Sequence, residues 1–178
     1  ARSFDLYGDP MGTLAELDSY GERVAGTIVE FAARVLVGEP NQFVLDGAKF
    51  AGKALTLAFV LANFPIHAAR GQLYIPLEYF ELCHAKYEDV FARRVTEELG
   101  KVCKTIAERG RGYLLGVTAQ RDRMPASSWP AFLPLAPVRP LFMQVWRRSY
   151  HPFKPPEMTA LRLQWRIPRR ALPAERTL

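Results

Sequence analysis

The sequence has few residues of the kinds that form disulfides or bind transition metals. It contains two cysteines and three histidines among 178 residues. Neither Cys83 nor Cys103 belongs to a CxxC pair, and no histidine stands at the spacing that would complete a zinc site. Two isolated thiols fit a reducing compartment or ordinary packing in a protein core. The composition therefore excludes a disulfide-stabilised scaffold and a structural zinc site.

Long apolar runs are also absent. The longest stretch without a charged side chain, residues 54–69, has 16 residues and contains Pro65. A helix that spans a bilayer needs about 20 apolar residues, so we expect a buried core helix here and no transmembrane segment. No continuous apolar run follows Ala1 and Arg2 either, and we expect no secretory signal at this start.

The common sequence motifs of enzymes are missing as well. There is no glycine-rich nucleotide loop, no HExxH helix, no GxSxG nucleophile and no calcium loop. Asp5 and Asp9 stand four residues apart, a spacing that on a helix brings two carboxylates to one metal ion. Gly8 and Pro10 favour a loop instead, so we expect no metal site in this segment.

Acidic residues are scarce in the second part of the chain. Residues 1–100 carry 9 Lys and Arg against 14 Asp and Glu, a net charge of −5, whereas residues 101–178 carry 15 against 4, a net charge of +11. A basic C-terminal half suits RNA, anionic lipid or an acidic protein surface, and charge does not choose among them. A binding surface and a solvated face both remain open for a set of arginines in this half: Arg121, Arg123, Arg147, Arg148, Arg169 and Arg170.

What the sequence does contain is a large apolar fraction arranged at helical spacing. Hydrophobic residues make up 49% and charged residues 24%, which is ordinary for one compact globular domain. Thr13 and Glu16 have the spacing of a capping box, and Gly38 and Pro40 supply helix-stop chemistry. Between them the apolar spacing predicts one amphipathic helix, whose buried stripe is Leu17, Tyr20, Val24, Ile28, Phe31 and Val35.

Further apolar patterns predict four more helices, at residues 43–63, 77–83, 88–120 and 138–150. The first of these is apolar on nearly every side, so it should be central, and it should stop near Pro65. The stretches 66–77 and 124–137 are predicted to be connections. Three glycines in the third of these helices predict tight packing against a neighbour: Gly110, Gly112 and Gly116.

The end of the chain departs from this helical pattern. Ten of the fourteen prolines lie after residue 120. Apolar residues then alternate with polar ones at Leu161, Leu163, Trp165 and Ile167. This period of two predicts an extended segment that lies along its own domain or a partner. We therefore expect an all-α fold in three parts, namely an N-terminal loop at 1–12, a helical domain at 13–153 and an extended, basic tail at 154–178.

Residues 54–76, ALTLAFVLANFPIHAARGQLYIP, carry the most specific pattern in the chain. They resemble the second Asp-rich signature of squalene and phytoene synthases, the all-α enzymes that join prenyl diphosphates head to head. The residues at matching positions are Ala54, Leu55, Leu57, Leu61, Arg70, Gly71, Tyr74 and Pro76. Weaker similarity covers most of residues 10–155, including a second family segment that is matched through Leu17, Tyr20, Val24, Ala25 and Gly26. The resemblance implies part of an isoprenoid-synthase-type helical domain.

The departures from the family pattern concern its metal site. In the family, two Asp residues four positions apart on this helix hold Mg²⁺, which binds the substrate diphosphate. Asn63 and His67 stand at these positions, and no Asp or Glu occurs from Gly47 to Leu77. An amide and an imidazole are poor Mg²⁺ ligands, and the family's first Asp-rich helix would lie upstream of Ala1. We therefore expect a non-enzyme with no cofactor and with no catalytic, cofactor-binding or metal-binding residue.

The roles of individual side chains near this signature stay open. His67 beside Arg70 could bind an anion or act as an acid or base, but a structural histidine that bonds to a backbone carbonyl is favoured. Phe59, Phe64 and Ile66 either fill the former prenyl cavity, which is favoured, or line a pocket that accepts a lipid or quinone tail. Three tryptophans are expected to pack within the protein: Trp129, Trp146 and Trp165.

Leu61, Pro65 and His67 also resemble a run in an offshoot of the family, the phytoene-synthase-like assembly factors of mitochondrial complex I. This resemblance implies a non-catalytic accessory subunit or assembly factor of a mitochondrial respiratory complex, with complex I as the first choice. The expected partners are other protein subunits of that complex, with lipid contact through the basic half. The expected location is the matrix side of the inner membrane, as a peripheral protein.

Two other classes of function remain open. A mitoribosomal or other RNA-associated protein would use the basic half for phosphate contacts, although no RNA-binding motif is recognisable. A prenyltransferase that takes its metal ligands from a separate chain, or that keeps only isoprenoid or lipid binding, is disfavoured by Asn63 and His67. Strong salt dependence of RNA affinity would favour the first class, and Mg²⁺-dependent release of diphosphate would favour the second.

Overall fold

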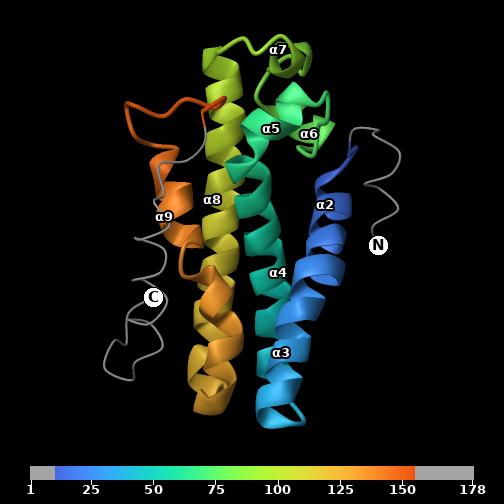
Figure 1. Ribbon diagram of the computed structural model, residues 1–178, viewed down its shortest axis with the longest axis vertical. Helices are drawn as coiled ribbons and strands as arrows, with labels where there is room; N and C mark the ends of the chain where they lie inside the picture. The colour runs from blue at the N-terminus through green and yellow to red at the C-terminus, as the bar shows by residue number, and fades with distance from the viewer. Residues whose placement is uncertain (1–10, 155–178) are drawn as a thin grey trace.

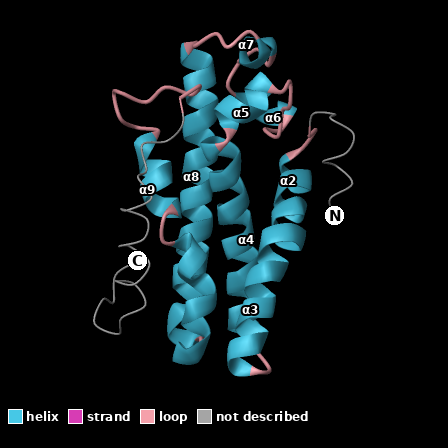
Figure 2. Ribbon diagram, viewed as in Figure 1, coloured by secondary structure: helices cyan, strands magenta, loops and turns pink. Residues whose placement is uncertain are grey.

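The computed structural model describes residues 11–154, and every regular element among them is a helix (Figure 1). Figure 2 shows helices joined by loops, with no strand in this part of the chain. The predicted all-α class is therefore confirmed. None of the described helices combines the length and the apolar composition that a membrane crossing requires. The predictions for Asp5 and Asp9, for most of the N-terminal loop and for the tail beyond Lys154 concern residues outside the described range.

The first helix, α2 (Leu14–Gly21), begins with the predicted capping box. The Thr13 hydroxyl accepts a hydrogen bond from the Glu16 backbone N–H at 3.2 Å, and the Glu16 carboxylate accepts one from the Thr13 N–H at 3.1 Å. These bonds satisfy N–H groups that have no partner inside the helix. The helical run ends at Gly38, where a φ of 72° suits a residue without Cβ.

A π-helical turn, η1 (Glu22–Gly26), separates α2 from α3 (Thr27–Val37). The Thr27 N–H donates to the Glu22 carbonyl, five residues earlier, so this turn holds one residue more than an α-helical turn. Because an α-helix advances about 100° per residue, the extra residue rotates every later side chain by about that angle.

The π-helical turn overturns the predicted buried stripe in α3. Ile28, Phe31 and Val35 are 63%, 62% and 86% exposed, whereas Val29 and Ala33 are buried. The prediction assumed one helical period along the whole segment. Before and within the turn it holds, since Leu17 is buried and Tyr20 and Val24 are half-buried, and it is wrong in α3, after the turn.

Helix α4 (Gln42–Ala62) is the centre of the fold, as its sequence predicts. Figure 1 shows it between the α2–α3 column and α8 (Glu97–Gln120), and it contacts both. At Gly52 the backbone of α4 lies so close to η1 that a Cβ would overlap the backbone of Gly26. Buried residues lie on more than one side of α4: Val44, Gly47, Ala48, Ala51, Gly52, Ala54, Thr56, Leu57, Ala58, Val60 and Leu61.

A short helix, α5 (Phe64–Ala69), follows almost directly on α4. The predicted stop near Pro65 is correct for α4, but the predicted connection at 66–77 is wrong in its first part. Pro65 lies in the first turn of α5, where backbone N–H groups have no partner within the helix. Proline has no N–H, so it costs the helix no hydrogen bond at this position. Gly71 then turns the chain with a φ of 67°, and α6 (Leu77–Leu82) follows where a short helix was predicted.

The long helix predicted at 88–120 is two helices. The first, α7 (Glu88–Phe91), is a single turn. The second, α8, begins at Glu97 after Thr96, whose hydroxyl accepts a hydrogen bond from the Leu99 N–H at 3.2 Å. A threonine in this position caps a new helix, and the apolar pattern did not reveal the boundary.

The three glycines of α8 for which tight packing was predicted differ in their surroundings. A Cβ at Gly110 would overlap the ring of Phe142, and a Cβ at Gly116 would lie 2.9 Å from the ring of Phe50. These two glycines mark close packing, as predicted. Gly112 faces open space, so the prediction is wrong there.

After α8 the chain reverses through two 3₁₀ segments, η2 (Arg121–Arg123) and η3 (Ala126–Leu135), and returns as α9 (Val138–Gln144) against α8. The predicted proline-rich connection is thus largely regular. Pro130 and Pro134 lie inside η3 and have no N–H for an α-helical ladder. Helix α9 ends earlier than predicted.

Candidate functional site at the α4–α5 junction

Asn63 stands between α4 and α5. Its side-chain nitrogen donates to the Phe59 carbonyl at 2.9 Å, and the same carbonyl accepts the Asn63 backbone N–H at 3.0 Å. Its backbone carbonyl accepts a hydrogen bond from the His67 N–H at 2.9 Å. The two residues at the signature positions therefore lie one helical turn apart, and the Asn63 amide nitrogen is bonded to the last turn of α4.

His67 is a buried aromatic side chain. Its ring centroid lies 5.8 Å from that of Phe59 and 4.5 Å from that of Tyr74. Its Nδ1 atom is buried without a hydrogen-bond partner among the described residues, so the predicted bond to a backbone carbonyl is not made at this atom. Burial, followed by the charge of Arg70, lowers the pKa of His67 below its ordinary value. A neutral ring packed between two aromatic rings is the result.

The bulky apolar residues of the junction divide between core and surface. Phe64 is buried, and its ring stacks on that of Phe153 at a centroid distance of 5.5 Å. Phe59 and Ile66 are 59% and 49% exposed. The favoured prediction that all three fill the former prenyl cavity requires buried side chains, and Phe64 alone meets that requirement.

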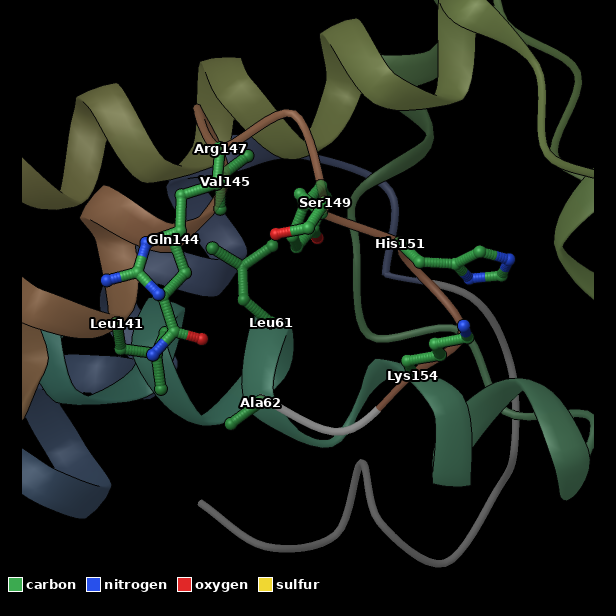
Figure 3. Close-up of a pocket in the computed structure, with 10 residues that line it drawn as sticks. Leu61, Ala62, Leu141, Gln144, Val145, Arg147, Ser149, His151 and Lys154 are labelled. Atoms are coloured by element: carbon green, nitrogen blue, oxygen red, sulfur yellow. The ribbon is translucent and has the colours of Figure 1, made fainter. Parts of the chain in front are cut away.

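A pocket of about 270 Å³ lies beside this junction. Figure 3 shows the Leu61 side chain, at the end of α4, pointing toward Ser149 in the loop that follows α9, and Ala62 also lines the pocket. Leu141 and Val145 add apolar surface. The remaining lining residues are polar or cationic: Gln144, Arg147, Ser149, Tyr150, His151 and Lys154. An apolar wall with cationic groups nearby suits an anionic group that carries a small apolar part.

Sequence analysis missed this pocket, because the loop after α9 carries no motif and joins α4 only in the folded chain. Arg147 was singled out, but only as a member of the basic face. Tyr150 and the buried Cys103 interact next to the pocket. Burial raises the pKa of Cys103 to about 11 and also raises the pKa of Tyr150, so both side chains are protonated near neutral pH. For Cys103 this confirms the predicted packing role.

A second polar cluster ties α2 to α8. Arg109 donates to the Asp18 carboxylate at 2.8 Å and to the Tyr113 hydroxyl at 2.7 Å, and the Tyr113 hydroxyl donates to Asp18 at 2.6 Å. Burial, reinforced by the hydrogen bond to Asp18, raises the pKa of Tyr113. Sequence analysis did not find this cluster, because its members on α8 are 91 and 95 positions from Asp18. Its paired groups hold two helices together.

The arginines predicted as a basic face lie in separate places. The Arg123 carbonyl accepts a hydrogen bond from Asn41, just before α4 begins, and its neighbour Arg121 lies over the Trp129 ring at 4.8 Å. Arg147 lines the pocket at the other end of α4. The described arginines therefore do not form one patch, and Arg169 and Arg170 lie outside the described residues.

The tryptophans also differ from one another. Trp129 packs against Phe132 with ring centroids 5.7 Å apart, as predicted. Trp146 is exposed, and the Arg111 guanidinium lies over its ring at 5.6 Å, so the predicted packing role is wrong for this residue. Trp165 lies outside the described residues.

Comparison with known proteins identifies the family of the chain. The sequence profile of the squalene/phytoene synthase family matches residues 1–171. The chain belongs to this family. Relatives include "NADH dehydrogenase (ubiquinone) complex I, assembly factor 6" of Rattus norvegicus and of Mus musculus, each 24% identical over 143 residues, which is 80% of this chain and 43% of the relative. "Phytoene synthase 2, chloroplastic" of Solanum lycopersicum is 26% identical over 158 residues, which is 84% of this chain and 50% of that protein.

The chain thus spans half the length, or less, of these curated relatives. The squalene and phytoene synthase resemblance predicted from residues 54–76 is confirmed, and so is the resemblance to the complex I assembly factors. Both kinds of relative match the chain at similar identity.

The side chains at the junction do not fit the Mg²⁺ site that the family resemblance implies. Mg²⁺ requires hard oxygen ligands, most often carboxylates. Asn63 offers a neutral amide in place of a carboxylate, His67 is buried with a lowered pKa, and residues 47–77 contain no Asp or Glu. Within residues 11–154, no group of three or more His, Cys, Asp and Glu side chains is placed to hold a metal ion.

Proposed function

We propose that this chain is a non-catalytic member of the squalene/phytoene synthase family that acts in the assembly of mitochondrial complex I. The observation that carries the proposal is its similarity to complex I assembly factor 6 over 80% of the chain. A plant phytoene synthase matches at comparable identity, so identity alone does not separate an assembly role from catalysis.

The chemistry of the α4–α5 junction favours the assembly role. Departure of diphosphate from a prenyl substrate requires a metal ion to neutralise its charge. Asn63 and His67 offer a neutral amide, whose nitrogen donates to the Phe59 carbonyl, and an imidazole buried beside aromatic rings. These side chains suit packing of two helices rather than metal binding, which supports a protein without catalytic activity.

The same proposal includes a location and partners. An assembly factor of complex I contacts complex I proteins, and we place the chain at the matrix side of the inner membrane as a peripheral protein. The exposed side chains of Phe59 and Ile66 supply apolar contact surface near the junction. Lipid contact is assigned to Arg147 and Lys154, which line the pocket beside it. In a narrower form of the proposal, the chain is a permanent accessory subunit.

Native-gel separation of mitochondria after gentle detergent treatment tests this proposal. The tagged chain is expected to migrate with partly assembled complex I, and mass spectrometry of the same band should identify complex I subunits. Stoichiometric migration with the mature complex would support the accessory-subunit form. Carbonate extraction of the membranes should release the chain into the supernatant, as expected for a peripheral protein.

Two results would overturn the proposal. The first is migration as a small species free of complex I proteins. The second is migration with the mitochondrial ribosome, because that would favour the RNA-associated class. A matrix enzyme of similar size, carrying the same tag, controls for adventitious association.

A further inference from the structure

A second pocket, the α8 pocket, lies where α8 meets the end of η3 and the start of α9. Its volume is about 440 Å³, and it shares no lining residue with the pocket beside the α4–α5 junction. Its buried lining residues are Val117 and Leu135, and Leu114 is half-buried. Small-molecule sites commonly measure about 300–1,000 Å³ and are mostly apolar. The α8 pocket therefore suits a small apolar or amphipathic molecule.

The open side of the α8 pocket follows one face of α8. Gly112 and Leu115 line it three positions apart, which places them on the same helix face, and Leu115 is 70% exposed. A Cβ at Gly112 would meet no atom within 4 Å. No neighbour therefore requires glycine here for close packing, and the missing side chain leaves room beside Leu115. A ligand that enters this room covers apolar surface.

Three exposed residues give the edge of the α8 pocket its charge. Arg111 and Arg139 are positive and Glu108 is negative, so the lining carries a net charge of +1. The Arg111 guanidinium lies over the Trp146 ring at 5.6 Å, and no ion pair of the described residues includes Arg111 or Glu108. A guanidinium can bind a carboxylate through two parallel N–H groups. The edge therefore favours an anion, and Glu108 favours one with a single charge, because it would repel the second charge of a phosphate monoester.

We propose that the α8 pocket binds a single-chain carboxylate of the fatty-acid type. Its hydrocarbon chain covers Leu115 and the apolar lining between α8 and η3, and its carboxylate binds the Arg111 guanidinium at the edge. Both parts of the ligand contribute, because the chain removes apolar surface from water and the carboxylate balances the net positive charge. The inference goes beyond the proposed function and does not rest on it.

Isothermal titration calorimetry of the full purified chain with dodecanoate tests this site. One dodecanoate should bind per chain, with a dissociation constant on the order of 100 µM for a small ligand in a partly open pocket. Acetate has the same head group without the chain, and dodecyltrimethylammonium has the same chain with a positive head group. Acetate should not bind measurably, and the cation should bind at least about tenfold more weakly than dodecanoate.

Gly112→Leu tests where dodecanoate binds. The new side chain would occupy the open space beside Leu115, so the affinity should fall by at least about tenfold. The Tm should not fall, because leucine favours a helix over glycine. Gly100→Leu is the matched control: Gly100 also lies on α8, a Cβ there also meets no atom within 4 Å, and it does not line the pocket. This variant should bind dodecanoate like the wild type.

Charge substitutions at the edge test where the carboxylate binds. Arg111→Gln should weaken dodecanoate binding by about fivefold, the upper range for an exposed charge pair. Glu108→Gln removes the neighbouring negative charge and should strengthen binding by about twofold. Circular dichroism and the Tm of each variant verify the fold. A purely structural role for these residues would not move the affinity in opposite directions.

Several results would overturn the proposal. Absence of dodecanoate binding at concentrations up to about 1 mM rules out the site. Binding that persists in folded Gly112→Leu, or that is lost equally in Gly100→Leu, places the ligand elsewhere. Equal affinity for dodecanoate and dodecyltrimethylammonium, or unchanged affinity in Arg111→Gln, removes the carboxylate from the edge. None of these results affects the test of complex I association.

Discussion

Helices α3 and α4 are both rich in apolar residues, yet they meet the rest of the protein in different ways. The α4 helix has neighbours on two sides, the α2–α3 column and α8, and buries small residues against them. The α3 helix packs through Val29 and Ala33 and carries the larger Ile28, Phe31 and Val35 on its outer face. The difference teaches that apolar content predicts a helix, whereas the size and spacing of its smallest residues determine which face is buried.

Glycine spacing explains how this difference arises. Gly21 and Gly26 both lie against α4, near Gly52 on that helix. In a regular α-helix two residues five positions apart point about 140° away from each other. The π-helical turn widens the spiral, so both glycines can approach α4. The same widening turns the stripe of α3 outward.

Gly52→Ala should have the largest effect on this arrangement. A Cβ at residue 52 would overlap the backbone of Gly26, which cannot move aside as a flexible side chain would. Overpacking of this kind costs about 1–3 kcal/mol, and more where backbone must shift. Urea unfolding measures the loss of unfolding free energy.

Gly112→Ala makes the same chemical change on α8, where a Cβ would meet open space. It should raise the unfolding free energy by about 1 kcal/mol, because alanine favours a helix over glycine. If Gly52→Ala were stabilising to the same extent, the close contact of α4 with the π-helical turn would be wrong.

Asp18→Ala should have the next largest effect, because it breaks the cluster that holds α2 against α8. The Arg109 guanidinium and the Tyr113 hydroxyl would both lose a charged partner in a part-buried place. Hydrogen bonds to charged groups contribute about 1.5–3 kcal/mol, and the partial exposure of Arg109 brings the expected loss to about 1–2 kcal/mol. Thermal or urea unfolding provides the measurement.

Asp46→Ala is the matched control for Asp18→Ala. Asp46 pairs with Lys49 on the exposed side of α4, with both side chains open to solvent. An exposed pair contributes about 0–1 kcal/mol. Equal losses in the two variants would show that the Asp18 cluster does not join the helices.

The pH dependence of stability tests whether burial continues past the end of α4. The pKa of His67 is lowered in the folded protein, so between that pKa and about 6.5 the unfolded chain binds more protons than the folded one. Stability should therefore be lost as the pH falls below about 6.5. His67→Phe removes the titrating group and should flatten the curve of unfolding free energy in this interval.

Measurements at pH 8, where histidine is neutral in both states, supply the reference for this comparison. Parallel curves for the wild type and His67→Phe would mean that His67 is solvated like a model histidine. That result would show that the His67 ring is not buried at the α4–α5 junction.

Ile28→Ala should have the smallest effect of these substitutions. Ile28 is exposed in α3, so its removal should change the unfolding free energy by less than about 0.5 kcal/mol. Val29→Ala, at the next position, removes a buried side chain and should cost about 1–2 kcal/mol. If Ile28→Ala lowered the unfolding free energy more than Val29→Ala, Ile28 would be the buried residue. That result would support the regular helix that the apolar pattern predicts and would exclude the π-helical turn.

Local signals in the sequence predict much of this fold. The Thr13 capping box, the central α4 and the all-α class follow from residues close together in the chain. The buried face of α3 and the start of α8 do not, because the first depends on contacts with α4 and the second on one threonine cap. The position of the candidate site was found by resemblance to a family signature.

The surroundings of the candidate site depend on residues far apart in the sequence. The pocket beside Leu61 needs the loop after α9, and the Asp18 cluster needs Arg109 and Tyr113 from α8. Local patterns therefore could not predict them. The unbonded Nδ1 of His67 is likewise a property of the folded environment.

A deletion-and-rescue experiment tests the central claim most directly. The gene is removed in the organism that encodes this chain, and wild-type, Asn63→Ala or His67→Phe protein is returned at equal abundance. Native gels then measure assembled complex I. The account predicts loss of assembled complex I without the gene and equal restoration by all three proteins, because neither side chain takes part in catalysis. Normal complex I without the gene, or failure of stable variants while the wild type restores assembly, would contradict it.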